Sequence, residues 1–232
     1  MLGFLLGCDI ESTTVVFSGE VQDAPGNAGK PVEGATVFSQ NREGDRVGEG
    51  LTDGVGAFAV DVPAGVSFFL TVEEDAYVPT GFSGVAGLED FESEAGLPWL
   101  ATPEWLAEQT AAHAACPTVG DVGTMVTGQA LMFMPTVADS GSWPALAEVE
   151  VEVLGSDGTT YAACYLDDEG VSLAEATGTG ATGEFAVFGV PPGGINVTLT
   201  VLRSSGDAGT DVFEYVAPTE GVIPIFPAAL EI

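Results

Sequence analysis

Two parts of the chain repeat one another at a nearly constant spacing, and this repeat constrains the fold more than any other feature. Residues 56–60 (GAFAV) match residues 183–187 (GEFAV), 127 positions later, and residues 70–72 (LTV) match residues 199–201 (LTV), 129 positions later. Between them, residues 62–65 (VPAG) match residues 190–193 (VPPG). A repeat of this length indicates two copies of one folded module.

Each copy has the pattern of β-strands joined by tight turns. Residues 148–153 read EVEVEV, which places valines on one face of a strand and carboxylates on the other. The VPxG segments reverse the chain, because proline fixes φ and glycine tolerates a positive φ. The 32 glycines and 14 prolines also favour many short strands. We therefore expect an all-β fold of two β-sandwich domains joined by a short helical connector.

The order of motifs in the first copy carries a family resemblance. Residues 19–21 (GEV), 31–37 (PVEGATV), 52–58 (TDGVGAF), 62–65 (VPAG) and 76–79 (AYVP) follow one another there. This order resembles the carboxypeptidase regulatory-like domain, and the second copy matches it less well over its first half. The resemblance implies two Ig- or transthyretin-like β-sandwiches with a non-catalytic role in an exported protein. It transfers no functional residues, because the family shares none.

These motifs divide the chain into four parts. We expect a signal remnant and lipobox with a tether at 1–12, a carboxypeptidase regulatory-like β-sandwich at 13–79, a connector with one short helix at 80–124, and a second such sandwich at 125–232. The helix is predicted from Pro103 to about Ala115, because Thr102 can cap its N-terminus and Pro117 stops it.

The opening of the chain predicts an anchor. Residues 5–8 (LLGC) resemble the bacterial lipobox, in which the cysteine receives a diacylglycerol thioether, and we predict Cys8 as the lipid attachment site. Only seven uncharged residues precede Cys8, so the basic region of a signal peptide would lie upstream of Met1. The alternative is a buried N-terminal strand with an unrelated cysteine. The prediction places the protein at the cell envelope, exported and lipid-anchored to the outer membrane or a periplasm-facing membrane.

The remaining cysteines form one possible pair. With Cys8 lipidated, Cys116 and Cys164 can form a disulfide that closes a loop of 49 residues, as suits an oxidising compartment. Two buried free thiols are the alternative, and the sequence leaves that choice open.

The charge is strongly negative. The chain has 35 Asp and Glu against four Lys and Arg, a net charge of −31. Such a surface repels nucleic acid and anionic lipid headgroups, so we exclude nucleic acid as a partner and expect membrane contact only through a lipid anchor. The acids fit either solubility or salt adaptation, or divalent-cation binding. Residues 167–170 (DDEG) have the wrong spacing for a calcium loop, so we expect no cofactor, with calcium as the alternative.

Four aromatic residues are candidates for ligand binding. Tyr77, Trp99, Trp105 and Trp143 would form a binding surface for a glycan or a protein if exposed. Packing of the connector on a sandwich explains Trp99 and Trp105 as well. His113 and Cys116 are three residues apart, but two ligands do not make a metal site and the chain has no other histidine. We predict no metal site.

The single histidine also argues against an enzyme. Intradiol dioxygenases and hydroxyisourate hydrolase share the transthyretin-like fold, but both need several histidines. No Gly-x-Ser-x-Gly motif is present, and residues 178–183 (GTGATG) lack the lysine of a phosphate-binding loop. We expect a non-enzymatic exported lipoprotein that acts as a structural or protein-binding module at the bacterial cell envelope, with a protein or glycan at the cell surface as partner. The alternatives are a carbohydrate-binding surface module and a self-assembling subunit that uses strand exchange.

Overall fold

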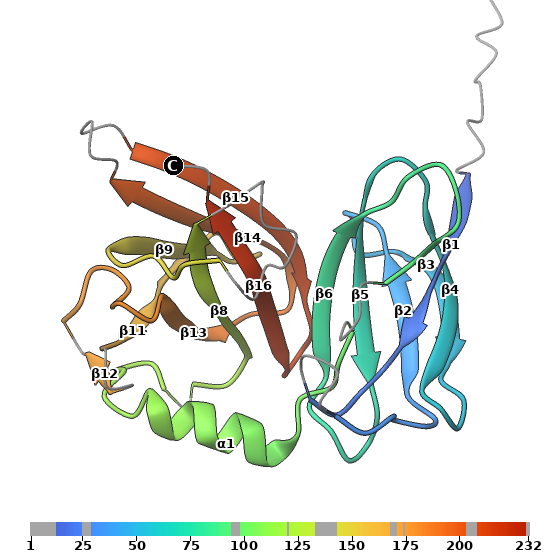
Figure 1. Ribbon diagram of the computed structural model, residues 1–232, viewed down its shortest axis with the longest axis horizontal. Coiled ribbons are helices and arrows are strands. Elements are labelled where there is room, and N and C mark those ends of the chain that lie inside the picture. Colours follow the sequence, from blue (N-terminus) through green and yellow to red (C-terminus); the bar gives the residue numbers. More distant parts are fainter. Residues whose placement is uncertain are drawn as a thin grey trace, which may run out of the picture.

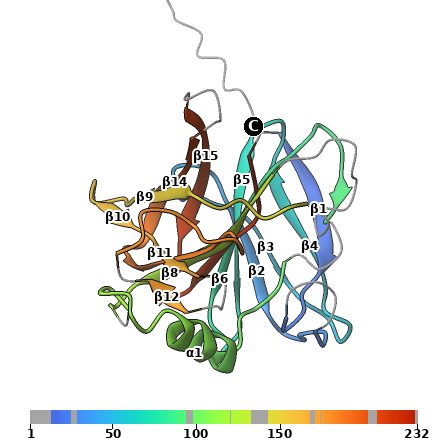
Figure 2. The same cartoon turned by 60° about the vertical axis from the view of Figure 1, so that its left-hand side comes forward.

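The fold consists of two β-sandwiches side by side, with one helix below the second (Figures 1 and 2). The computed structural model describes residues 13–24, 29–93, 98–119, 121–132, 143–167, 171–173, 175–202 and 208–230. The expected all-β class with a helical connector is confirmed. Within the described residues, no helix has the length and apolar character needed to cross a membrane.

The first sandwich is built from strands in the first hundred residues. These strands are β1 (Thr14–Glu20), β2 (Thr36–Gln40), β3 (Arg46–Leu51), β4 (Ala57–Pro63), β5 (Ser67–Glu73), β6 (Thr80–Val85) and β7 (Phe91–Glu92). One sheet has the order β4-β1-β7 and faces the run β6-β5-β2-β3. Between them lies an apolar core that includes Phe17, Phe58 and Phe68.

The second sandwich follows the helix α1 (Pro103–Ala112). Its strands are β8 (Thr124–Met132), β9 (Val149–Leu154), β10 (Thr160–Ala162), β11 (Cys164–Leu166), β12 (Ser172–Leu173), β13 (Glu184–Val190), β14 (Gly193–Leu202), β15 (Ala208–Ala217) and β16 (Val222–Leu230). The sheet β10-β9-β14-β15 faces the run β12-β11-β13-β8-β16. Phe185, Leu199 and Ile225 are buried in the core between them.

The sequence repeat corresponds to a repeat of structure. The antiparallel pair β1–β4 has its counterpart in β8–β13, and β2–β5 in β9–β14. Gly56 and Gly183, at φ of 79° and 72°, immediately precede the equivalent strands β4 and β13, and glycine suits this backbone conformation. The repeat therefore encodes two copies of one strand topology, as predicted.

A buried threonine is repeated with the same bonds. The Thr52 hydroxyl donates to the Val32 carbonyl at 2.7 Å and accepts from the Ala35 N–H at 2.8 Å. The Thr179 hydroxyl, 127 positions later, donates to the Leu146 carbonyl and accepts from the Val149 N–H. Each hydroxyl satisfies two buried backbone groups next to a strand start, where valine would leave them unpaired.

The two sandwiches share one sheet. In the described residues this sheet has nine strands in the order β12-β11-β13-β8-β16-β6-β5-β2-β3, and β16 stands between the two halves. β16 runs parallel to β8, and its first residue, Val222, also pairs with Thr80 at the start of β6. Val222 belongs to the first core, whereas its neighbour Ile223 belongs to the second. One strand therefore contributes to both hydrophobic cores.

Two local assignments differ from the sequence analysis. β6 pairs with β5 along its length, and β7 pairs with β1, so residues 80–92 add strands to the first sandwich although they were expected in the connector. The helix ends at Ala112 rather than near Ala115. The chain turns at this point, with the Cys116 N–H bonded to the His113 carbonyl, and this turn brings Cys116 to β11.

Candidate functional site

The predicted site residues fall in three places. Cys8, the predicted lipid attachment site, lies outside the described residues. Cys116 and Cys164 meet beside the second sandwich, and three of the four aromatic candidates pack on the first.

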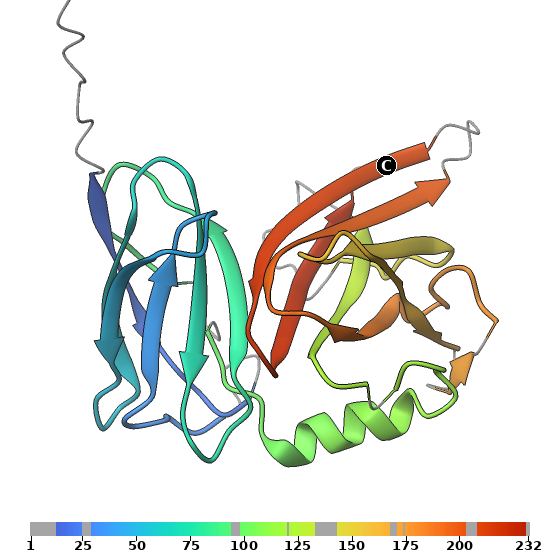
Figure 3. The ribbon, with the colours of Figure 1, turned by 180° about the vertical axis from the view of Figure 1, so that it is seen from behind.

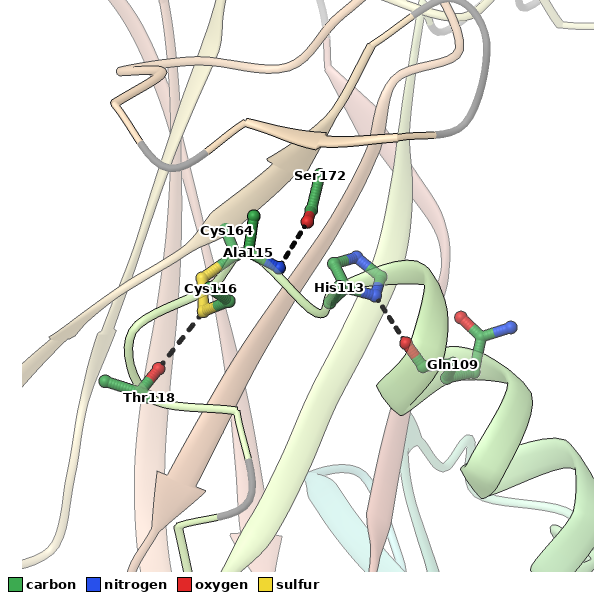
Figure 4. The surroundings of a disulfide bond; sticks show 7 residues. All are labelled: Gln109, His113, Ala115, Cys116, Thr118, Cys164 and Ser172. Carbon is green, nitrogen blue, oxygen red and sulfur yellow. Dashed lines mark hydrogen bonds between the residues drawn. A yellow bond between two sulfur atoms is a disulfide. The ribbon is translucent and has the colours of Figure 1, made fainter.

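Cys116 and Cys164 form a disulfide bond, shown in Figure 4, which is one of the two states that the sequence left open. Their Cα atoms are 5.7 Å apart, and both side chains are buried. The bond ties the turn after α1 to the first residue of β11. A second tie lies next to it, since the Ala115 N–H donates to the Ser172 hydroxyl of β12 at 2.8 Å. The end of α1 is therefore fixed to the outer edge of the second sandwich.

His113 caps α1 and is the least typical side chain of this region. It is 1% exposed and packs its ring edge against Phe188 at 5.8 Å between ring centroids. Nδ1 lies 2.8 Å from the Gln109 carbonyl, so Nδ1 carries the proton and Nε2 carries the lone pair. Nε2 is buried without a hydrogen-bond partner among the described atoms. Burial lowers the pKa of His113, against the opposing effects of the Gln109 carbonyl and of Glu184.

This environment predicts a loss of stability on mild acidification. The pKa of His113 is lowered in the folded state. As the pH falls, His113 is therefore protonated near pH 6.5 in the unfolded chain, but only at a lower pH in the native protein. The free energy of unfolding should therefore fall as pH drops below about 6.5, by at most about 1.4 kcal/mol per pH unit for this one proton.

Urea unfolding between pH 7.5 and 5 measures this effect. The matched variant is His113→Asn, whose amide can still donate to the Gln109 carbonyl but does not titrate. The free energy of unfolding of this variant should change less with pH over the same range. If the free energies of the parent and the variant fall in parallel with pH, His113 does not cause the change.

The four aromatic candidates are buried or half-buried. Trp99 is 4% exposed and packs edge-on against Phe82 and Trp105, so of the two readings of this residue the structure has the packing one. Trp105 and Tyr77 are half-buried against the same first core. Trp143 is half-buried and, within the described part of the chain, is not a member of that core cluster. Trp99 and Trp105 therefore attach the start of α1 to the first sandwich.

Tyr77 lines an acidic hollow of the first sandwich. Its pKa is raised by burial and then by the negative charges of Asp23 and Glu74. The hollow of about 580 Å³ is also lined by Glu73 and Asp75. Among the described residues, however, no group of three or more His, Cys, Asp or Glu side chains is placed to hold a metal ion.

Side-chain contacts across the junction reinforce the shared sheet. The side chain of Tyr215 in β15 forms a hydrogen bond with Ser83 of β6. Burial raises the pKa of Tyr215 to about 12. Arg42, in the turn between β2 and β3, forms an ion pair with Glu214 of β15. Sequence analysis missed these residues because each contact joins positions more than 130 residues apart, for which no local pattern exists.

Two hollows lie along β6, beside this junction. A hollow of about 450 Å³ on one side of β6 is lined mainly by phenylalanine side chains, and a second of about 260 Å³ lies on the other side, against β15. Ser83, Gly84 and Val85 line both. Sequence analysis missed this region because residues 80–85 (TGFSGV) contain two glycines and were read as connector.

Comparisons with known proteins give no close relative. No family model matches the chain, and no curated protein matches it. Among solved structures, the chain is similar to the TIE protein of Bacillus anthracis, at 12% identity and a TM-score of 0.32, covering 91% of this chain and 33% of that one. The chain thus spans about a third of that protein's length.

Two pilins are similar at comparable levels. The shaft pilin SpaA from Lactobacillus rhamnosus GG shows 12% identity and a TM-score of 0.28, covering 94% of this chain and 98% of that one. GBS52, the minor pilin of Streptococcus agalactiae, shows 11% identity and a TM-score of 0.26, covering 93% and 95%. At these values the likenesses carry no argument about this chain.

Proposed function

We propose that the chain is a non-enzymatic module that acts structurally, and by binding another protein, at the bacterial cell envelope. It is held there by a lipid on Cys8, and its two domains are of the carboxypeptidase regulatory-like type. The observation that carries the proposal is the rigid connection of the two sandwiches. β16 inserts into both halves of one sheet, and α1 bridges them on another side.

This connection suits a spacer or binding platform. Two domains joined by a flexible linker reorient freely, whereas domains that share a sheet hold their surfaces in a fixed relation. The disulfide adds to the proposal, because such bonds persist mainly in exported proteins. The buried His113 supports the non-enzymatic role, since its Nε2 lies away from solvent.

The intact mass of the protein purified from native membranes tests the anchor and the compartment. We expect a mature chain that begins at acylated Cys8 and gains two hydrogen masses when the Cys116–Cys164 bond is reduced. A Cys8→Ser variant should be released from the membrane fraction. A chain that keeps residues 1–7, carries no lipid and has three free thiols would contradict the proposal.

A further inference from the structure

Among the described residues, β6 pairs with β16 only at its first residue, and the two strands diverge from there (Figures 1 and 3). On one side, every residue from Thr80 to Val85 pairs with β5. On the other side, among the described residues, only Thr80 pairs, with Val222 of β16. Beyond Gly81, which lies against the Val216 carbonyl and Ile223, the backbone of Phe82 to Val85 pairs with no strand on this side in that part of the chain. β15 lies near these residues through side chains, since Tyr215 is hydrogen-bonded to Ser83 and a hollow separates Val85 from Val212.

The inner face of this edge opens onto the phenylalanine-lined hollow. Phe17, Phe68, Phe82 and Phe91 line it together with Leu70, and Phe91 packs its ring 4.9 Å from that of Phe17 and 5.9 Å from that of Phe68. The opening exists because β7, the neighbouring edge of the facing sheet, has only two residues. Within the described part of the chain, no strand covers the side of the first sandwich between β6 and β7.

The outer face of the same edge carries exposed aliphatic side chains. Val85 is 75% exposed, and across the smaller hollow Val212 of β15 is 57% exposed. Val66, next to β5, is 52% exposed, and its carbonyl accepts the N–H of Ala86 just after β6. A cluster of exposed aliphatic side chains beside an unpaired strand is typical of an interaction surface.

These features fit one kind of ligand, an extended peptide segment. A strand added to β6 would pair with the outward N–H and C=O groups of Phe82–Val85, which no described strand pairs with. Side chains of a strand alternate between faces, so one set would enter the phenylalanine-lined hollow and the other would lie over Val85 and Val212. A hollow of about 450 Å³ has room for several aliphatic side chains.

Charge decides between a second copy and a different partner. Each copy carries a net charge of −31, so two copies repel one another. The phenylalanine-lined hollow also contributes Glu92, whereas Glu214 of the smaller hollow is already paired with Arg42. A segment with lysine or arginine between its apolar residues would be attracted by this field and would fit the faces of the groove.

We propose that Phe82–Val85 of β6 is a β-augmentation site for an extended basic segment of a partner protein, with alternating apolar side chains. The site would make the first sandwich the recognition module and the second its rigid, disulfide-closed support. This inference rests on the proposed protein-binding function and names the surface that performs it.

The probe is a fluorescent, capped peptide of about nine residues that alternates lysine and valine. One control peptide replaces lysine by glutamate, and another carries proline at its centre, which removes a ladder N–H. We expect the lysine–valine peptide to bind at least about ten-fold more tightly than either control in fluorescence anisotropy. Hydrogen exchange of the Phe82–Val85 amides should slow when it binds.

Variants at Val85 test the location. Val85→Lys should lower the affinity for the lysine–valine peptide by at least about five-fold, and Val85→Glu should raise it. The reason is that the added charges lie beside the peptide lysines. Val122, 83% exposed in the loop before β8, provides the matched controls Val122→Lys and Val122→Glu. These should change the affinity by less than about two-fold, because they alter the net charge equally but lie away from β6.

Four results would overturn the inference. The first is that the proline peptide binds as tightly as the lysine–valine peptide, and the second is that substitutions at Val85 and Val122 change the affinity equally. The third is a dimer that protects the β6 amides without peptide, and the fourth is peptide binding only after replacement of residues 94–97. The first two would indicate nonspecific charge attraction. The last two would identify a second copy, or residues 94–97, as the occupant. A native partner that binds the Val85→Lys variant normally would leave the proposed function intact and overturn this site alone.

Discussion

Replacing both Cys116 and Cys164 by alanine should lower the free energy of unfolding by about 4 kcal/mol. The disulfide joins positions 48 apart in sequence, and in the chain-entropy model a loop of this length restricts the unfolded ensemble by about that amount. Both side chains are buried, so alanine introduces no new polar group. The loss is large beside the roughly 5 to 15 kcal/mol by which a domain is stable.

Urea unfolding of the parent and of the double variant, each with and without reductant, measures this effect. Reduction should destabilise the parent by a similar amount and leave the variant unchanged. Ser172→Ala is the local control, because it removes the bond to the Ala115 N–H at the same edge and should cost only about 0.5–1.5 kcal/mol. A parent that resists reductant, with a variant of equal stability, would show that the bond contributes nothing.

The sequence predicted what depends on local pattern. Alternation in residues 148–153 and the glycine-started strands at 56 and 183 specify individual strands and turns, and the structure has them in equivalent places. The cysteine count suggested the pairing of Cys116 with Cys164, because Cys8 had a separate predicted role. The strands and turns depend on residues close together in sequence. The disulfide depends on cysteine, of which only two remained to pair with one another.

The parts that escaped prediction depend on pairing between distant residues. The bond of Val222 with Pro79 and the pairing of β16 with β8 bring together segments some hundred residues apart, and side-chain alternation does not specify the partner of a strand. β6 was missed because two glycines weaken its strand signal, although Gly84 is required there: a methyl group would lie 2.8 Å from the Phe68 ring. The sequence left open whether Trp99 packs or is exposed, because its neighbour in space, Phe82, lies in that unrecognised strand.

Ile223→Ala should destabilise both sandwiches, by about 2–5 kcal/mol in total. Ile223 is fully buried in the second core, and its Cγ1 lies 3.3 Å from the position of a methyl group on Gly81 of β6. The adjacent Val222 is buried in the first core. A cavity at Ile223 therefore loosens the strand on which both cores depend, so the loss should not stay within one domain.

Native-state hydrogen exchange of the Ile223→Ala variant separates this outcome from local damage. Amides of β5 in the first sandwich and of β14 in the second should exchange faster by a similar factor, because the two halves open together through β16. Leu51→Ala, at a site 68% exposed on the far edge strand β3, should change stability by no more than about 0.5 kcal/mol. Faster exchange confined to β14 and its sheet would mean that the sandwiches are energetically independent. In that case the shared sheet would position the β6 surface without stabilising it.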